Sequence, residues 1–214
     1  MKKTIDQRNK TICFYGPDGA GKTTIAIGLE YLLNKRMRVR RVWVRGTHLL
    51  LSILARILAR FKSFKGRDNP YYGLRIPRKI VKLWVFLELV NFIPVYIGRY
   101  IVPRIMGYTV VGERGVADFI AWIILTTRNP QFLNTLAGRF LVSLALRDNC
   151  IYVYSEPAIL YARRSDEISL HDAIKQVITY NRLAELLGSR SINTGDMSLK
   201  ETIKKILRLT LLKQ

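Results

Sequence analysis

The chain has few of the residues that build disulfide scaffolds and metal centres. Its 214 residues include two cysteines and two histidines. Neither Cys13 nor Cys150 has a second ligand at the short spacing that zinc sites use, which argues against a structural metal and against a disulfide-dense secreted domain. We therefore expect both cysteines to be reduced thiols in the core of an intracellular, cytoplasmic protein.

The sequence also lacks a long uncharged apolar run. Charged side chains interrupt the very apolar region 80–106, at Lys82, Glu88, Arg99 and Arg104. No segment therefore approaches the ~18 uncharged residues that a membrane span requires. The first ten residues, MKKTIDQRNK, lack the apolar core of a secretory signal. We predict no membrane span, and one long buried helix over about residues 77–105.

Acidic residues are scarce: 15 Asp and Glu stand against 36 Lys and Arg, for a net charge of +21. Such a surface attracts polyanions, whether nucleotides, nucleic acid or an anionic membrane. A solvated basic surface with no dedicated partner is an equally good interpretation of the charge alone. An apolar content of 49% favours a globular protein over a disordered one.

The most informative stretch is residues 11–24, TICFYGPDGAGKTT. Residues 16–23 fit G-x-x-x-x-G-K-[ST], a loop that wraps phosphate with backbone N–H groups between an apolar strand and an amphipathic helix. We expect nucleotide contacts from Gly16, Asp18, Gly19, Ala20, Gly21, Lys22, Thr23 and Thr24. Lys22 would reach the β- and γ-phosphates of ATP, and the Thr23 hydroxyl would hold Mg²⁺.

Strand-like and helix-like segments alternate along the rest of the chain. Apolar strands are predicted at 11–15, 38–44, 108–111, 150–154 and 190–193, with helices between them and a basic loop at 62–76. Pro94 should kink or split the long helix. This alternation predicts an α/β, three-layer P-loop NTPase fold: one domain over residues 1–214, with a five-stranded parallel sheet covered by helices on both faces.

Ligands of such a sheet gather at the carboxyl ends of its strands. The residues that follow the predicted strands are Arg45, Glu113 with Arg114, Arg163 with Arg164, and Asn193. Glu113 is placed to hold Mg²⁺ and Arg114 to clamp a phosphate. Arg163 and Arg164 suit a short lid at about 163–170 that closes over the transferring phosphoryl group. Asn193, with Thr194 and Gly195 after it, suits the backbone-rich rim of a base site. Ordinary strand-end and helix-end ion pairs are the alternative for these charges.

A guanine-nucleotide switch is disfavoured, because no D-x-x-G follows the loop and Asn34-Lys35 lacks the acid of N-K-x-D. The order of motifs instead resembles the thymidylate kinase family: GPDGAGKTT, then Arg45-Gly46-Thr47, an apolar helix, VVGER and a basic segment. The resemblance implies that Asp18, Arg45, Glu113 and Arg114 face the acceptor nucleotide and that the lid arginines close over ATP. It also implies a homodimer paired through helices and a base-stacking role for Phe86, for which packing in the core is the alternative because the residue belongs to an apolar stripe on a buried helix. The family's arginine on the long helix has no counterpart in FLELVN, which leaves the acceptor base open.

The leading hypothesis is a nucleoside monophosphate kinase that transfers the ATP γ-phosphoryl to dTMP or a similar monophosphate. Lys22, Arg114, Arg163 and Arg164 would be its catalytic residues. The alternative is a P-loop ATP-binding protein that binds nucleic acid through basic residues in 36–45 and 62–67. A family member that binds nucleotide without turnover is a third possibility.

Overall fold

A computed structural model describes residues 11–69, 71–148 and 150–211. The expectation about a signal in the first ten residues lies outside this range. Five strands form one parallel sheet in the order β2-β4-β1-β5-β6. They are β1 (Thr11–Tyr15), β2 (Val39–Val42), β4 (Thr109–Gly112), β5 (Ile151–Tyr154) and β6 (Ser191–Asn193). The predicted five-stranded parallel α/β fold is confirmed.

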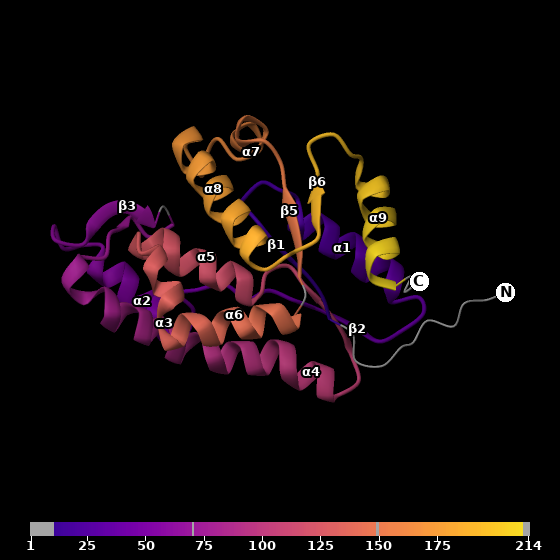
Figure 1. Ribbon diagram of the computed structural model, residues 1–214, viewed down its shortest axis with the longest axis horizontal. Helices are drawn as coiled ribbons and strands as arrows, with labels where there is room; N and C mark the ends of the chain where they lie inside the picture. Colours follow the sequence, from indigo (N-terminus) through magenta and orange to yellow (C-terminus); the bar gives the residue numbers. More distant parts are fainter. Residues whose placement is uncertain (1–10, 70, 149, 212–214) are drawn as a thin grey trace.

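Alternation along the strands gives the sheet two apolar faces. In β1, Cys13 and Tyr15 join one buried cluster, whereas Ile12 and Phe14 join the other. One face is covered mainly by α2 (Leu49–Leu58), α3 (Val81–Tyr96), α5 (Val116–Thr127) and α6 (Leu136–Asp148). The other face is covered mainly by α1 (Lys22–Leu33) and α9 (Leu199–Leu211), with α7 (Pro157–Arg163) and the start of α8 (Leu170–Leu186) (Figure 1).

The predicted long helix is present. It runs from Arg78 through α3, a π-helical turn (Ile97–Ile101) and α4 (Val102–Ile105). Pro94 does not end α3, and the change to π-helical geometry comes three residues after it. By length and composition alone Arg78–Ile105 could cross a membrane, and 39% of its most apolar window is buried inside the protein. One such helix is weak evidence for a span, because core helices meet the same criterion. Fully buried Glu88 and buried Trp84 place one side of this helix in the protein core.

The predicted basic loop is only partly a loop. β3 (Lys65–Asn69) lies outside the main sheet, and Lys65 and Asn69 form antiparallel bridges to Leu74. Gly73, one of the residues that predict a loop here, lies in the turn at 71–73 that leads from β3 back to Leu74.

The prediction of two reduced thiols is wrong, because Cys13 and Cys150 form a disulfide. β1 and β5 are neighbours in the sheet, and the two Cα atoms lie 4.6 Å apart although 137 positions separate them in sequence. Spacing along the chain does not reveal such a contact.

Candidate active site

The glycine-rich loop joins β1 to α1, and its glycines adopt backbone conformations that other residues avoid. Gly19 and Gly21 have φ angles of +85° and +83°. A Cβ atom at Gly21 would meet no other atom within 4 Å, so it would project into open space beside the loop. The loop therefore leaves a hollow beside its backbone amides at the start of α1, where the helix dipole favours an anion.

Lys22 begins α1 and is only 5% exposed. Its Nζ donates to the backbone carbonyls of Gly16 and Pro17, each at 2.6 Å. Burial, together with the nearby Arg114 cation, lowers the pKa of Lys22 to about 7. A phosphate anion beside Nζ would supply the negative charge that this ammonium group lacks.

A cavity of about 330 Å³ lies over the loop. Loop, strand-end and C-terminal residues line it together: Asp18, Gly19, Gly21, Lys22, Thr23, Thr24, Ile25, Arg114, Arg163, Arg164, Thr194, Met197, Leu199 and Thr202. The predicted phosphate loop and the predicted strand-end arginine therefore share one cavity.

Asp18 is the centre of a charge cluster at one side of this cavity. Its carboxylate accepts hydrogen bonds from Arg114, from Arg45 at 3.3 Å and from the Tyr71 hydroxyl. Burial alone would raise the pKa of Asp18, but the Arg114 and Arg45 guanidiniums hold it well below its ordinary value. Asp18 is therefore ionised, and it orients two guanidiniums that come from the ends of different strands.

Aromatic side chains hold Arg45 in place. Its guanidinium carbon lies 4.2 Å from the ring centre of Tyr71 and 4.5 Å from that of Trp122. Such cation–π contacts fix the guanidinium without neutralising it. Arg45 is thus oriented by two rings and one carboxylate, and it keeps donors for a further anion.

Glu88 of α3 anchors the segment that carries Arg45. Its carboxylate accepts a hydrogen bond from the Thr47 N–H at 2.6 Å and another from the Thr47 hydroxyl. Trp122 Nε1 also donates to Glu88 at 3.2 Å. Thr47 has a φ of +54°, which is unusual for a residue with a Cβ. We conclude that Glu88 stabilises the strained backbone that positions Arg45.

Arg114 is fixed from two sides. It donates to Asp18 and, at 2.7 Å, to Asp118 one helical turn further along α5. Tyr180 from α8 donates to the same Asp118 oxygen. Gln176 of α8 accepts a hydrogen bond from the Asp18 N–H at 2.7 Å. α5, α8 and the loop are thereby joined around Arg114.

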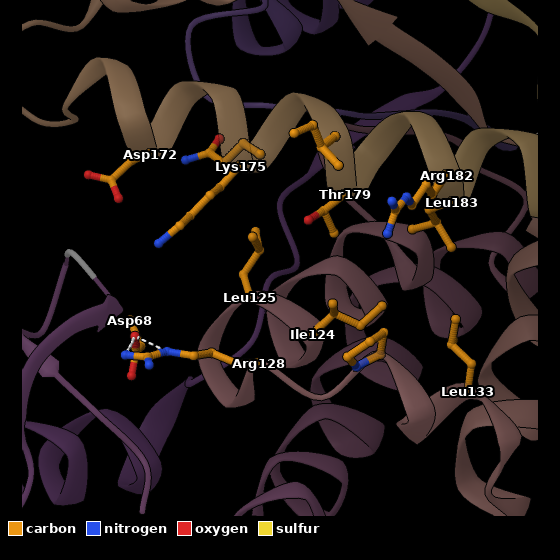
Figure 2. A pocket seen from close by; sticks show the side chains of 13 residues that line it. Asp68, Ile124, Leu125, Arg128, Leu133, Asp172, Lys175, Thr179, Arg182 and Leu183 are labelled. Carbon is orange, nitrogen blue, oxygen red and sulfur yellow. Dashed lines mark hydrogen bonds and ion pairs between the residues drawn. The ribbon is translucent and has the colours of Figure 1, made fainter.

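A second cavity, of about 460 Å³, lies between α5 and α8 beside β3 (Figure 2). Its wall includes the apolar residues Ile124, Leu125, Leu133 and Leu183 and the charged residues Asp68, Arg128, Lys175 and Arg182. Gln176 also lines this cavity, so it adjoins the Asp18 side of the loop.

Two predicted substrate residues lie apart from this cluster. Glu113 accepts a hydrogen bond from Arg41, whose Nε also donates to Glu30 of α1 at 2.9 Å. Phe86 is 60% exposed on the outer side of α3. The structure therefore brings Asp18, Arg45 and Arg114 together, but it does not bring Phe86 to them.

The predicted lid residues take different positions. Arg163, at the end of α7, donates to the carbonyls of Gly19 and Thr194, at 3.2 Å each, whereas Arg164 pairs with Glu167. Asn193 is occupied by the turn that follows β6, where it donates to Asp196 at 3.0 Å and accepts from the Gly195 N–H at 2.9 Å. The neighbouring Thr194, rather than Asn193, lines the cavity over the loop.

Five contributors were not predicted from the sequence: Tyr71, Glu88, Asp118, Trp122 and Gln176. Asp118 had a detectable signal, because it follows Arg114 by four residues and lies in the first turn of α5. Tyr71, Trp122 and Gln176 reach the site from distant segments, and no local pattern in the sequence marks them.

Solved structures of other proteins share this architecture, although no relative is found by sequence. No protein-family model matches the chain, and no curated protein matches it by sequence. Among solved structures, the thymidylate kinase of Ehrlichia chaffeensis is similar at a TM-score of 0.52 and 16% identity, covering 94% of this chain and 98% of that one. Deoxyadenosine kinase of M. mycoides with bound dATP is similar at a TM-score of 0.50 and 15% identity, with coverages of 93% and 98%. The fold is that of the P-loop kinases.

Proposed function

We propose that this protein is a nucleotide kinase that transfers the γ-phosphoryl group of ATP to the phosphate of a nucleoside monophosphate. The observation that supports it best is the cluster at Asp18. A carboxylate of the phosphate loop orients two guanidiniums from other strand ends, Arg45 and Arg114. Two such groups beside a triphosphate site suit a second, anionic substrate.

On the donor side, the loop amides and Lys22 hold the β- and γ-phosphates of ATP. Lys22 supplies a charge where negative charge accumulates in the transition state, without forming a covalent intermediate. Arg163 already donates to the loop carbonyl of Gly19, so a modest rotation of its side chain would bring it to the phosphates. Arg164 would join it by leaving Glu167.

On the acceptor side, Arg114 and Arg45 hold the monophosphate with its oxygen aligned to the γ-phosphorus. Positioning of this kind accounts for most of the catalysis in phosphoryl transfer. Tyr71 and Trp122 surround Arg45 and offer aromatic surface near the acceptor. The cavity between α5 and α8 gives room for the rest of the acceptor (Figure 2).

The metal that this chemistry uses fits the donor set. Mg²⁺ prefers oxygen ligands and shares them with phosphates and water. Thr23 lines the cavity over the loop, whereas the described residues contain no group of three or more His, Cys, Asp or Glu that could hold a metal without the nucleotide. We therefore assign Mg²⁺ to Thr23 together with the phosphates, where it would neutralise developing charge. Glu113, paired with Arg41, we assign to the strand-end ion pair.

The acceptor class separates this proposal from its nearest alternative. One structural neighbour is named as a deoxyadenosine kinase and the other as a thymidylate kinase. A nucleoside acceptor has no phosphate, and its hydroxyl needs a carboxylate nearby as general base. A monophosphate acceptor instead needs cationic side chains that bind its phosphate. Arg45 and Arg114 favour the monophosphate, with dTMP as the first candidate.

The test is a screen of the common nucleosides and nucleoside monophosphates for stimulated ADP formation. We expect stimulation by a monophosphate and none by the matching nucleoside. Lys22→Ala should abolish it while the protein stays folded, because the loop then lacks its phosphate-facing cation. Unchanged turnover in Lys22→Ala, or stimulation by a nucleoside alone, would refute the proposal.

A further inference from the structure

Acidic side chains are scarce in one part of the chain, which therefore carries most of the net positive charge. Residues 31–147 carry 21 of the 36 basic side chains but only four acidic ones. All four acids are engaged: Asp68 with Arg128, Glu88 with Thr47, Glu113 with Arg41 and Asp118 with Arg114. This part of the described chain therefore presents cations without free carboxylates to balance them.

The same part carries an exposed apolar surface on α3. The apolar stripe consists of Leu83, Phe86, Val90, Ile93 and Ile97, each between 42% and 60% exposed. These residues recur every three or four positions, so they share one side of the helix. From residue 83 to 98 the only charged side chain is Glu88, which is fully buried on the opposite side. Exposed Lys79, Lys82 and Arg99 lie at the two ends of the stripe.

The neighbouring helix repeats this composition. α2 packs against α3, and α3 and α4 run along the lower edge of the view (Figure 1). On α2, Leu50, Ile53 and Ile57 are between 46% and 80% exposed. Arg56 on the same helix and Arg60 just beyond its end are exposed as well. Apolar side chains bordered by lysine and arginine, without exposed acids, are typical of helices that lie on a membrane surface.

We propose that the apolar stripe of α3, with α2 beside it, docks this protein on an anionic lipid bilayer. The helix would lie in the interface rather than cross it, since Trp84, Phe92 and Tyr100 on its other side are packed in the core. The apolar residues enter the acyl boundary while the flanking lysines and arginines meet anionic headgroups.

Charge favours the bilayer over the other occupants. The homodimer that the resemblance implies, if it used this face, would bring together the lysines and arginines that border two copies of the stripe, with no exposed acids to pair them. Nucleic acid would satisfy the cations but would leave the apolar stripe in water, because its contacts are made mainly to phosphates. An anionic bilayer satisfies both the charged and the apolar parts of the surface.

The test is flotation of the full-length protein with vesicles of phosphatidylcholine, with and without ~30% phosphatidylglycerol. We expect binding to the anionic vesicles that is at least ~10-fold stronger than to the neutral ones and that weakens with salt. Phe86→Ser and Val90→Ser should each reduce it ~10-fold, because each removes an apolar side chain that the bilayer would bury, without a change in charge. Leu186→Ser is the matched control: Leu186 is 52% exposed on α8, outside the proposed surface, and its loss should change nothing.

Light scattering measures the oligomeric state of the parent and of the variants, and a binding assay with duplex DNA tests nucleic acid as the occupant of this surface. ATP binding by each variant shows that it is folded. Equal binding to both kinds of vesicle, no binding, or Ser variants that bind like the parent would overturn the proposal. So would a stable dimer that Phe86→Ser converts to monomers, or DNA binding that displaces the protein from vesicles and depends on Phe86.

Discussion

The guanidinium of Arg114 and the carboxylate of Asp18 are hydrogen-bonded across 96 positions of the sequence, linking the end of β4 to the phosphate loop. Arg114 is also held by Asp118, so its orientation is set from both sides. Arg114→Lys keeps the charge but loses the planar fork that can meet two oxygens at once. We expect kcat/KM for the acceptor to fall ~100-fold, with ATP affinity within about threefold of the parent.

The control for that variant is Arg60→Lys, an exposed arginine beyond α2, which should leave steady-state kinetics unchanged. If Arg114→Lys raised the KM for ATP instead of that for the acceptor, the assignment of Arg114 to the acceptor side would be wrong.

Lys22 should make ATP binding depend on protons. Its pKa is lowered to about 7 by burial and by Arg114, so above pH 7 the free protein holds it largely neutral. A bound triphosphate favours the charged form and raises the pKa. Binding at pH 8 should therefore take up close to one proton, and binding at pH 6 close to none. ATP affinity should fall as pH rises above 7.

Calorimetry at pH 8 in two buffers of different ionisation enthalpy measures this uptake. Lys22→Arg, whose guanidinium stays protonated, is the control and should bind with no uptake at that residue. Equal proton uptake by the parent and Lys22→Arg would show that another group is responsible.

Glu88 should contribute to stability as well as to the site. Glu88→Ala leaves the buried Thr47 N–H and Trp122 Nε1 without this acceptor and opens a cavity. We expect a loss of about 3 kcal/mol in the free energy of unfolding, measured in urea, and a higher KM for the acceptor. Glu88→Gln keeps one acceptor oxygen and should lose less. Equal stability of Glu88→Ala and the parent would contradict the anchoring role.

Gly46 is needed because Trp122 lies against it. A Cβ atom at Gly46 would overlap the indole ring. Gly46→Ala should therefore displace Trp122 from Arg45, destabilise the protein by about 1–3 kcal/mol and raise the acceptor KM ~10-fold. Gly98→Ala is the matched control, since a Cβ atom there meets nothing within 4 Å. A Gly46→Ala variant with the parent's acceptor KM would show that Trp122 does not position Arg45.

The Cys13–Cys150 disulfide closes a loop of more than 130 residues. Such a cross-link restricts the unfolded chain, which predicts a stabilisation of about 4 kcal/mol. Alkylation of the denatured protein without reductant should label neither cysteine. Double substitution to Ser should lower the unfolding free energy by about that amount. Two labelled thiols in the non-reduced protein would contradict the disulfide.

Most of the fold was predictable because it depends on local pattern. Alternating residues of β1 and the glycines before Lys22 mark the loop and the sheet, and the structure agrees with the predicted strands within a few residues. β3 was read as a loop because Gly66, Gly73 and the Asn69-Pro70 pair in this segment indicate turns. The disulfide depends on two strands becoming neighbours, which no spacing along the chain encodes.

The candidate site was predictable only where a strand end placed a residue. Arg45 and Arg114 follow β2 and β4, and both reach Asp18. Tyr71 and Trp122 come from a turn and from mid-helix, where aromatic residues are ordinary. Glu88 was read as an interruption of an apolar helix, whereas burial makes it the anchor of the Arg45 segment. Long-range packing, not local sequence, determines these roles.

The most direct test of the central claim follows the γ-phosphate of ATP by ³¹P NMR in the presence of dTMP and the other common monophosphates. We predict that one monophosphate is converted to its diphosphate as ATP becomes ADP, and that Arg114→Lys slows this conversion. If the γ-phosphate of ATP appeared only as inorganic phosphate, at a rate that no monophosphate changes, the result would contradict the account.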